Sequence, residues 1–388
     1  MNDKPMSYAS LKSVFQRMEP NLRIQLSLRL PSIRLAERSV PMYIQRFDMT
    51  PNSTHIDGTR YCVWWADQNG RLGTWNDYDL TPDGFRDFSV DDKVSPGDVV
   101  HPQTEDDRLN RRRVEIERTR AVGEVKKLRI CFEMDWGRDR FATQYLEYNR
   151  TLADAAKYMN EKLLGGRRDA IRVKYFGDSE RVLRLPEGLQ VRPFWITVRH
   201  HVEELFNAYK ELLDTSALKA LLFSGKMDLL KLEKNYNHPI VRSLKHLLVE
   251  SSDGNWLEVC LNVKNEMVHF ECGITTVTIA RVIDAWSREG RPIGTQFSFG
   301  FREEGSFKRL LESYPNSAIE RCTMVGCRSF PDTTTIPFLH DSDSEISMFC
   351  KECYDNLWLR VCYELYIIVT PKGHRHFWNV NFDDSVFK

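Results

Sequence analysis

Apolar residues near the N-terminus of the chain recur every three or four positions, which is the spacing of one helical face. They are Tyr8, Leu11, Phe15, Met18 and Leu22. Ser7 can cap the start of this helix, and Pro20 interrupts it. Residues 22–30 fit both the alternation of a strand and the spacing of a helix, and the short segment IRLAERSV ends at Pro41. We interpret residues 1–40 as three short helices, which need the rest of the chain or a partner to cover their apolar stripe.

From about residue 150 the pattern alternates between helical and extended segments. The segment TLADAAKYMNEKLLGG predicts a helix that ends at Gly165 and Gly166. Short apolar segments follow at intervals of 20 to 29 residues, which is the period of leucine-rich-type β/α repeats. Their centres are Val173, Ile196, Leu221, Leu248, Val268 and Phe297. Helical segments between them, such as VEELFNAYKELL and TVTIARVIDAW, favour a parallel sheet with right-handed crossovers.

Two architectures fit this alternation. One is an open solenoid in which each unit covers the apolar edge of its neighbour, and the other is a closed or doubly wound sheet with a crevice at its strand ends. No glycine-rich turn leads from a strand into a helix, as a dinucleotide-binding or phosphate-binding loop requires. We therefore predict an α/β fold, an irregular leucine-rich-repeat-like β/α solenoid over residues 151–319, whose concave strand face would bind a macromolecule.

The flanking regions have other patterns. Residues 41–150 contain the strand-like segments MYIQRFDM, YCVWWAD and KKLRICFEM, with a long polar loop over about residues 67–120. Three arginines at 111–113 could contact phosphate, but the acidic residues beside them favour an ordinary solvated charge run. Residues 320–388 are rich in β-branched and aromatic residues with turn signals between them, so we predict an antiparallel sheet that caps the solenoid.

The composition of the chain argues against some classes of function. The chain has 388 residues, and its 55 basic residues equal its 55 acidic residues, so its net charge gives no long-range attraction to nucleic acid or anionic membranes. No apolar run reaches the roughly 18 residues that a membrane span needs. Nine cysteines, an odd number, indicate free thiols in a reducing compartment, so we expect a cytoplasmic or nuclear protein.

Four cysteines provide the one metal-like pattern. Cys322 and Cys327, followed by Cys350 and Cys353, could supply thiolate ligands to zinc. The first spacing is looser than that of a zinc knuckle, so free cysteines are favoured and we expect no metal or other cofactor. The sequence holds neither a Gly-x-Ser-x-Gly nucleophile elbow nor the two-histidine motif of zinc hydrolases, so we expect no enzyme activity.

Several stretches resemble a known family. The N-terminal pattern PMSYASLKSVFQRMEPNLRIQLSLRLPSIRLAERSVPMYI and the segments VLRLPEGLQV and PIGTQFSFGF are similar to a nematode family of F-box-like and F-box-associated proteins with a central domain of unknown function. The resemblance implies that the N-terminal helices are an F-box-like module, which in F-box proteins docks on the adaptor subunit of a cullin–RING ubiquitin ligase. Leu11, Phe15 and Met18 would then form the adaptor-docking face.

These expectations lead to a protein-interaction function without catalysis. The chain would be an F-box-like substrate-recognition adaptor of a cullin–RING ligase, with protein partners and with no nucleic acid or membrane. The alternative is a scaffold or binding protein that has no link to ubiquitin ligation. The recognition face would consist of polar and aromatic residues on or beside the predicted strands. They are Arg172, Lys174, Trp195, Lys219 and His269.

Overall fold

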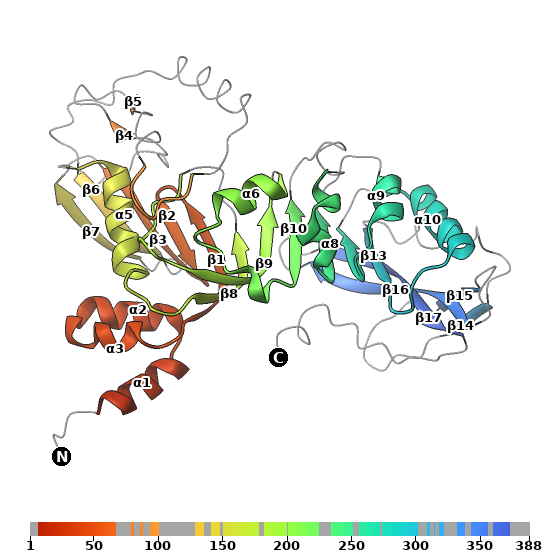
Figure 1. Ribbon diagram of the computed structural model, residues 1–388, viewed down its shortest axis with the longest axis horizontal. Helices are drawn as coiled ribbons and strands as arrows, with labels where there is room; N and C mark the ends of the chain where they lie inside the picture. Colours follow the sequence, from red (N-terminus) through yellow and green to blue (C-terminus); the bar gives the residue numbers. More distant parts are fainter. Residues whose placement is uncertain are drawn as a thin grey trace. The chain divides into compact units, whose positions relative to one another are not determined.

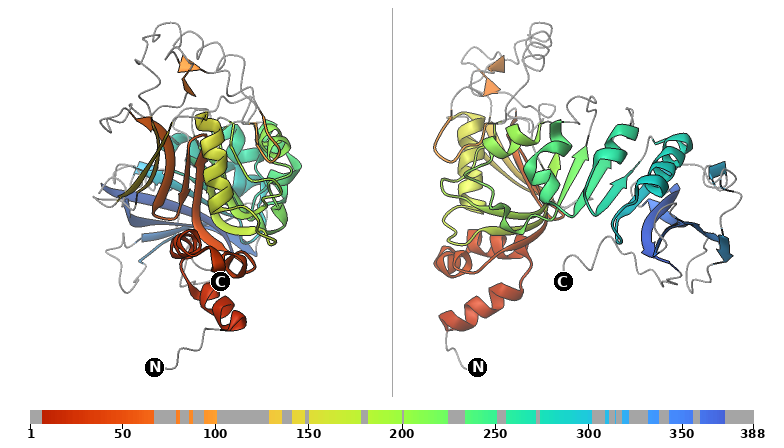
Figure 2. Two further views of the ribbon diagram at one scale, coloured as in Figure 1. Left: turned by 90° about the vertical axis from the view of Figure 1, so that its left-hand side faces the viewer. Right: turned by 45° about the vertical axis from the view of Figure 1, so that its right-hand side comes forward.

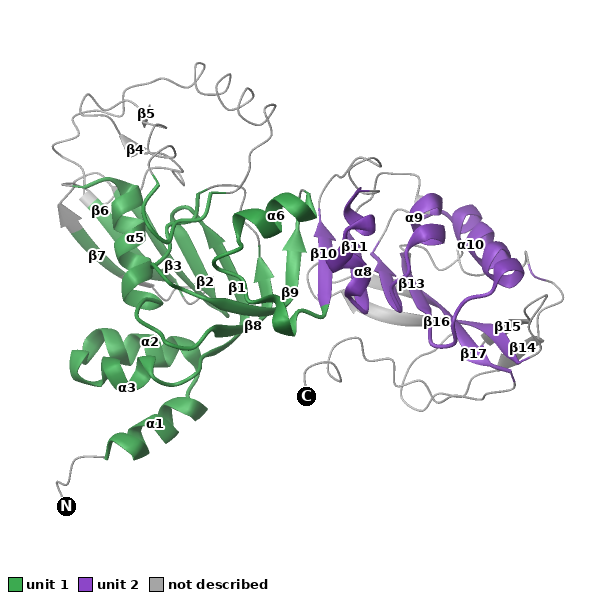
Figure 3. Cartoon of the chain, in the orientation of Figure 1, with its two compact units in different colours: residues 1–219 green, residues 220–388 purple. Residues whose placement is uncertain are grey.

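The computed structural model divides the chain into two compact units, residues 1–219 and residues 220–388 (Figure 1, Figure 3). Each unit contains its own strands and helices, so both are α/β structures. The described residues are 7–66, 79–80, 86–87, 94–100, 129–135, 141–147, 150–177, 182–199, 201–224, 234–250, 256–271, 274–301, 309–310, 314, 318–321, 332–337, 343–355 and 360–372.

Three short helices open unit 1, as the apolar pattern predicts. They are α1 (Tyr8–Arg17), α2 (Pro20–Arg29) and α3 (Arg34–Arg38), the last preceded by the 3-10 turn η1 (Pro31–Ile33). The Ser7 hydroxyl caps α1 by accepting a hydrogen bond from the Ser10 N–H at 3.1 Å. The Glu19 carboxylate caps α2 by accepting from the N–H groups of Asn21 and Leu22. Because Pro20 then takes the first helical position, where no N–H is needed, the ambiguous segment 22–30 becomes a helix.

A mixed sheet forms the centre of unit 1. In spatial order its described strands are β9 (Val191–Val198), β8 (Ile171–Gly177), β1 (Tyr43–Thr50), β2 (Ser53–Ile56), β3 (Thr59–Ala66), β6 (Arg129–Asp135) and β7 (Phe141–Glu147). β9, β8 and β1 pair parallel, whereas β1, β2, β3, β6 and β7 pair antiparallel. The short strands β4 (Asp79–Leu80) and β5 (Arg86–Asp87) pair with each other. The three strand-like segments predicted within residues 41–150 are β1, β3 and β6.

Two helices cover one face of this sheet, α5 (Leu152–Leu163) and α6 (Val202–Ala208) (Figure 1, Figure 2). Thr54 on β2 donates a hydrogen bond to Asn160 on α5 at 2.6 Å. The ring of Phe176 on β8 meets the ring of Tyr209, which follows α6, with 5.9 Å between centroids. The chain leaves α5 through Gly166 at a φ of 72°, a left-handed conformation that favours glycine, so the predicted stop is confirmed.

Unit 2 begins with parallel strands in chain order. They are β10 (Ala220–Ser224), β11 (His246–Glu250), β12 (Met267–Phe270) and β13 (Gln296–Phe301). The connecting helices α8 (Pro239–Ser243), α9 (Trp256–Asn262) and α10 (Thr276–Glu289) lie on one side of these strands, as right-handed crossovers require (Figure 3). Trp286 on α10 is buried and packs edge-on against Phe297 on β13, with 4.7 Å between ring centroids.

Antiparallel strands extend the sheet of unit 2 beyond β13. β17 (Arg360–Pro371) pairs with β13, and β16 (Ser344–Asp355), β15 (Asp332–Pro337) and β14 (Ala318–Arg321) follow in this order. The antiparallel character predicted for residues 320–388 is therefore confirmed for the strands that the structure describes.

The six predicted β/α strands exist, and within each unit they pair parallel to their neighbours in the sequence. Two features differ from the prediction. The described residues between β8 and β9 contain no helix, and the chain instead bridges from Leu183 to Val99. β8 also pairs with β1, so strands from residues 41–150 share a sheet with the β/α segments. This pairing gives the backbone of β8 a hydrogen-bonding neighbour along both of its edges.

Candidate interaction surfaces

Exposed apolar side chains gather on the N-terminal helices. Thirteen large apolar side chains of the described residues are exposed, and six of them lie between residues 8 and 35. These six are Tyr8, Val14, Leu22, Leu28, Leu30 and Leu35. Leu35, on α3, is 71% exposed, more than any other of the thirteen. Single exposed leucines are ordinary on protein surfaces, but six large exposed apolar side chains in so short a segment are unusual. We refer to Leu22, Leu28, Leu30 and Leu35 as the exposed leucines.

The residues expected to dock on the ligase adaptor face the interior of the helical module. Phe15 is 1% exposed and forms a buried cluster with Ala36 and Val40. Leu11 and Met18 are partly buried against the same cluster. α1 therefore packs its apolar stripe on α3 and on the residues that follow α3. Docking through Phe15 would require α1 to separate from α3, and the adaptor-docking role of this stripe stays a prediction.

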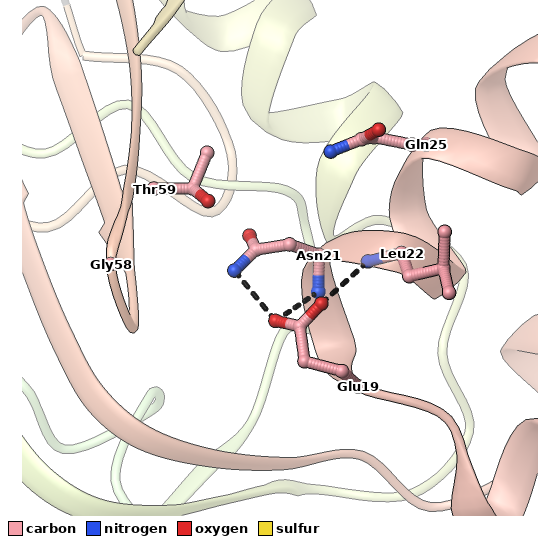
Figure 4. A pocket seen from close by; sticks show the side chains of 6 residues that line it. All are labelled: Glu19, Asn21, Leu22, Gln25, Gly58 and Thr59. Carbon is pink, nitrogen blue, oxygen red and sulfur yellow. Dashed lines mark hydrogen bonds between the residues drawn. The ribbon is translucent and has the colours of Figure 1, made fainter. Parts of the chain in front are cut away.

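A cleft of about 410 Å³ opens beside α2 (Figure 4). It is lined by Glu19, Asn21, Leu22, Gln25, Gly58 and Thr59. The first four residues belong to the cap and the first turns of α2, and the last two belong to the turn between β2 and β3 and the start of β3. The cleft therefore lies between the N-terminal module and the sheet of unit 1, and one of its walls carries an exposed leucine.

Hydrogen bonds hold the wall of this cleft in place. Asn21 Nδ2 donates to Glu19 Oε1 at 2.8 Å and to the Ile56 carbonyl at 3.0 Å, and the Tyr61 hydroxyl donates to Asn21 Oδ1 at 2.9 Å. Burial raises the pKa of Tyr61, so its hydroxyl keeps the proton that it donates. Glu19 is the one ionisable residue among those that line the cleft, and its carboxylate already accepts three N–H groups. The cleft thus offers apolar and amide contacts to a peptide, without an acid–base pair for catalysis.

Three of the predicted recognition residues lie on the neighbouring strands β8 and β9. Arg172 is exposed, and Lys174 is half-buried with its ammonium 5.0 Å from the centre of the Tyr175 ring. Tyr175 pairs in register with Trp195, and their rings are 5.6 Å apart. Trp195 is 5% exposed, so its indole packs within the sheet layer and offers little surface to a partner.

The remaining two recognition residues, Lys219 and His269, belong to different units. Lys219 follows the 3-10 turn η4 (Thr215–Ala217) and places its ammonium 5.9 Å from the centre of the Phe194 ring. His269 belongs to unit 2, where its Nδ1 and the Ser298 hydroxyl form a 2.8 Å hydrogen bond on the buried strands β12 and β13. Lys174 and Trp195 therefore contact the same ring, that of Tyr175, whereas Lys219 contacts Phe194 and His269 belongs to unit 2.

A row of polar residues that the sequence did not reveal crosses four strands of unit 1. The register places Asp48 on β1 beside His55 on β2, His55 beside Arg60 on β3, and Arg60 beside Asp135 on β6. Residues paired in this way point to the same face, with Cβ atoms roughly 4.5–5.5 Å apart. Thr54, which contacts α5, precedes His55 on β2, so the row lies on the face opposite the helices.

The acidic and basic side chains of this polar row offset one another. Arg46 Nε donates to Asp48 Oδ2 at 2.6 Å, and Arg46 pairs in register with Tyr175, so the aromatic pair shares this face. Burial lowers the pKa of His55, Arg60 lowers it further, and Asp48 acts in the opposite sense. The imidazole is therefore neutral at pH 7 and can donate from one nitrogen and accept at the other. The alternation in MYIQRFDM, with Arg46 and Asp48 two positions apart, was the one sequence signal of this face.

Two free thiols lie on neighbouring strands of unit 1, Cys62 on β3 and Cys131 on β6. Cys62 and Cys131 are buried, and desolvation raises their pKa values to about 12 and about 11, so both stay protonated and unreactive at neutral pH. Cys350 lies on β16, as does Cys353, whereas the other two cysteines of the zinc pattern, at 322 and 327, lie outside the described residues. Across the described ranges no group of three or more His, Cys, Asp or Glu side chains could hold a metal ion.

The described helices are also too short or too polar to span a bilayer.

The fold and these surfaces define an α/β protein with a helical N-terminal module. Residues 151–303 match a family model described as Domain of unknown function (DUF3557). The match begins at the cap of α5 and ends just after β13, so it covers the predicted β/α region and omits the N-terminal helices and the antiparallel strands at the C-terminal end. No curated protein and no solved structure matches the chain.

Proposed function

We propose that this protein is a non-enzymatic interaction protein that docks on a protein partner through its N-terminal helices. The concentration of exposed apolar side chains between residues 8 and 35 carries the proposal, because water-facing leucines on a small helical module are most simply explained by a partner that covers them. The cleft beside Leu22 extends this surface and can accept a side chain of the partner.

The finer proposal is a substrate-recognition adaptor of a cullin–RING ubiquitin ligase, working in the cytoplasm or nucleus. Its support is the resemblance of the chain to nematode F-box-like and F-box-associated proteins, together with three short helices at the expected place. In this proposal the module binds the ligase adaptor, and the β/α region, read as an irregular leucine-rich-like solenoid with an antiparallel cap, binds the substrate protein. Arg172 and Lys174, both on β8, are among the predicted recognition residues that would contact the substrate protein.

The second candidate function is a scaffold without a ligase link. The burial of Phe15 favours it, because the stripe that the F-box resemblance assigns to the adaptor is already covered by α3. The two functions share the exposed leucines and differ in the identity of the partner.

Binding experiments with the full chain separate these cases. The wild type should retain the ligase adaptor, and Leu35→Asp should abolish this binding because a carboxylate would be buried at the interface. Val277→Asp is the matched control, since Val277 is 62% exposed but lies on α10 in unit 2, and it should leave binding unchanged.

The pattern of results decides between the proposals. If the wild type does not bind the ligase adaptor but binds other proteins, and Leu35→Asp loses these proteins, the result supports the scaffold. Identical partners for the wild type and Leu35→Asp would contradict docking through the N-terminal helices altogether.

A further inference from the structure

An Arg–Glu–Arg triad joins the N-terminal helices to the turn after α5. Glu37 on α3 is 1% exposed at its side chain, and it lies between Arg23 on α2 and Arg167, which follows α5. Arg23 Nε donates to Glu37 Oε1 at 3.2 Å, and Arg167 Nη2 donates to Oε1 at 2.8 Å and to Oε2 at 3.0 Å. Arg23 also donates to the carbonyls of Pro41, Glu37 and Val40, so its guanidinium is well satisfied.

Arg167, unlike Arg23, has N–H groups without a hydrogen-bond acceptor. Its side chain is only 4% exposed, yet its Nε and Nη1 find no hydrogen-bond partner anywhere in the described structure. The Nε of Arg34, on α3, is also buried and unpartnered, whereas its Nη2 donates to the Ser27 carbonyl at 3.3 Å. A buried polar group without a partner costs free energy, and more when it is charged, so these donors call for an acceptor. Arg34 and Arg167 both lie close enough to Arg38 to lower its pKa, so the unpartnered donors belong to one group of arginines and are a structural signal of a ligand.

Positive charge exceeds negative charge in this neighbourhood. Arg34 and Arg38 lie four residues apart on α3, which places like charges side by side. The Arg38 guanidinium lies against Gly166, where an added Cβ would be 2.7 Å from its Nη1, and Arg38 Nη2 donates to the carbonyl of Glu161 at 3.3 Å.

We refer to Arg23, Arg34, Arg38 and Arg167 as the arginine cluster, and Glu37 is the single carboxylate buried within it. The pKa of Arg38 is lowered by burial first and then by its neighbours Arg34 and Arg167, whereas Glu37 and Glu161 act in the opposite sense, so four guanidinium groups face two carboxylates.

We propose that the arginine cluster binds a small tetrahedral oxyanion, phosphate or sulfate, beside Arg167 and Arg34. Planar guanidinium groups match the geometry of such oxyanions and form their strongest hydrogen bonds with them. An anion here would accept from the unpartnered donors and offset the positive charge that Glu37 and Glu161 leave uncompensated. The burial of Arg167 selects a small free ion over a phosphate group carried on a macromolecule. This site is independent of the proposed docking function, because it uses buried arginines rather than the exposed leucines.

Thermal unfolding of the full chain in inorganic phosphate tests the proposal. Phosphate should raise the unfolding temperature above that in sodium chloride of the same ionic strength, and sulfate should do the same. Arg34→Gln should weaken phosphate binding at least about tenfold, because it removes a charge-assisted donor. Arg34 is only half-buried, so this variant retains the triad and should fold.

A control variant and two results that would contradict the proposal complete the experiment. Arg168→Gln changes the exposed arginine next to Arg167 and should alter phosphate affinity by less than about twofold. If phosphate stabilises the wild type no more than matched chloride does, or stabilises Arg34→Gln as much as the wild type, the proposal is wrong.

Discussion

Replacing Phe15 by alanine tests whether the apolar stripe of α1 is core or docking surface. Phe15 is 1% exposed against Ala36 and Val40. An aromatic side chain buries about 150–250 Å², so truncation to alanine removes roughly 120 Å² of buried apolar contact. At about 25 cal/mol per Å² the loss is about 3 kcal/mol, the lower end of the range for such truncations in cores. This is a large part of what three short helices can contribute by packing.

The consequence is local opening of the N-terminal module. A loss of about 3 kcal/mol raises the open fraction about 100-fold, so amide hydrogen exchange in α1, α2 and α3 should accelerate by that factor. The strands of unit 2 should exchange as in the wild type. Leu35→Ala is the control, because a side chain 71% exposed should change stability by less than about 0.5 kcal/mol. Unchanged exchange in the Phe15→Ala variant, combined with lost partner binding, would refute the reasoning and restore Phe15 as a docking residue.

Three further changes probe other parts of the structure. Glu37→Gln leaves two buried guanidinium groups without their carboxylate and should cost about 3–5 kcal/mol in urea unfolding; a loss below about 1 kcal/mol would contradict the buried triad. Cys62, with a pKa of about 12, should resist iodoacetamide at pH 8 until urea unfolds the chain, and alkylation of the folded protein at the rate of a free thiol would contradict its burial. Gly300→Ala places a Cβ against the Glu271 carbonyl oxygen, closer than van der Waals contact allows, and should cost about 1–3 kcal/mol. Gly58→Ala meets no atom within 4 Å and should be neutral, so equal melting temperatures for the two variants would contradict the steric argument.

The regular spacing of apolar residues was sufficient to predict the helices and strands that bury one apolar face. The N-terminal helices, the helix that ends at Gly165 and Gly166, and the six β/α strands each carry a regular apolar pattern with turn residues at their ends. Pairing is harder, because β8 joins β1 across more than 120 residues of sequence and both strands are compatible with several neighbours. The sequence therefore predicts strand segments within residues 41–150 without their partners, although these strands complete the sheet of unit 1.

The polar row and the buried triad lay beyond sequence reasoning for a related reason. The neighbours Asp48, His55, Arg60 and Asp135 result from the register of four strands, and a slip of one residue would send any of them to the opposite face. Glu37 and Arg167 are 130 residues apart and both look like ordinary surface charges in the sequence. Burial of a charge depends on its partner, and the partner is known only from the tertiary structure.

The packing of α1 also bears on the choice between a terminal cap and a docking module. A module that only covered the end of the sheet would bury its apolar residues inward and present polar residues to water. Here the stripe with Phe15 is already buried on α3, and Arg23 and Asn21 attach α2 to the rest of unit 1. Leu35, which is 71% exposed, therefore contributes little to either contact, and the other exposed leucines leave 36% to 50% of their surface to water. Surface that serves neither the interior of the module nor its attachment to the sheet is the surface that a partner can cover, and this favours docking over a simple cap.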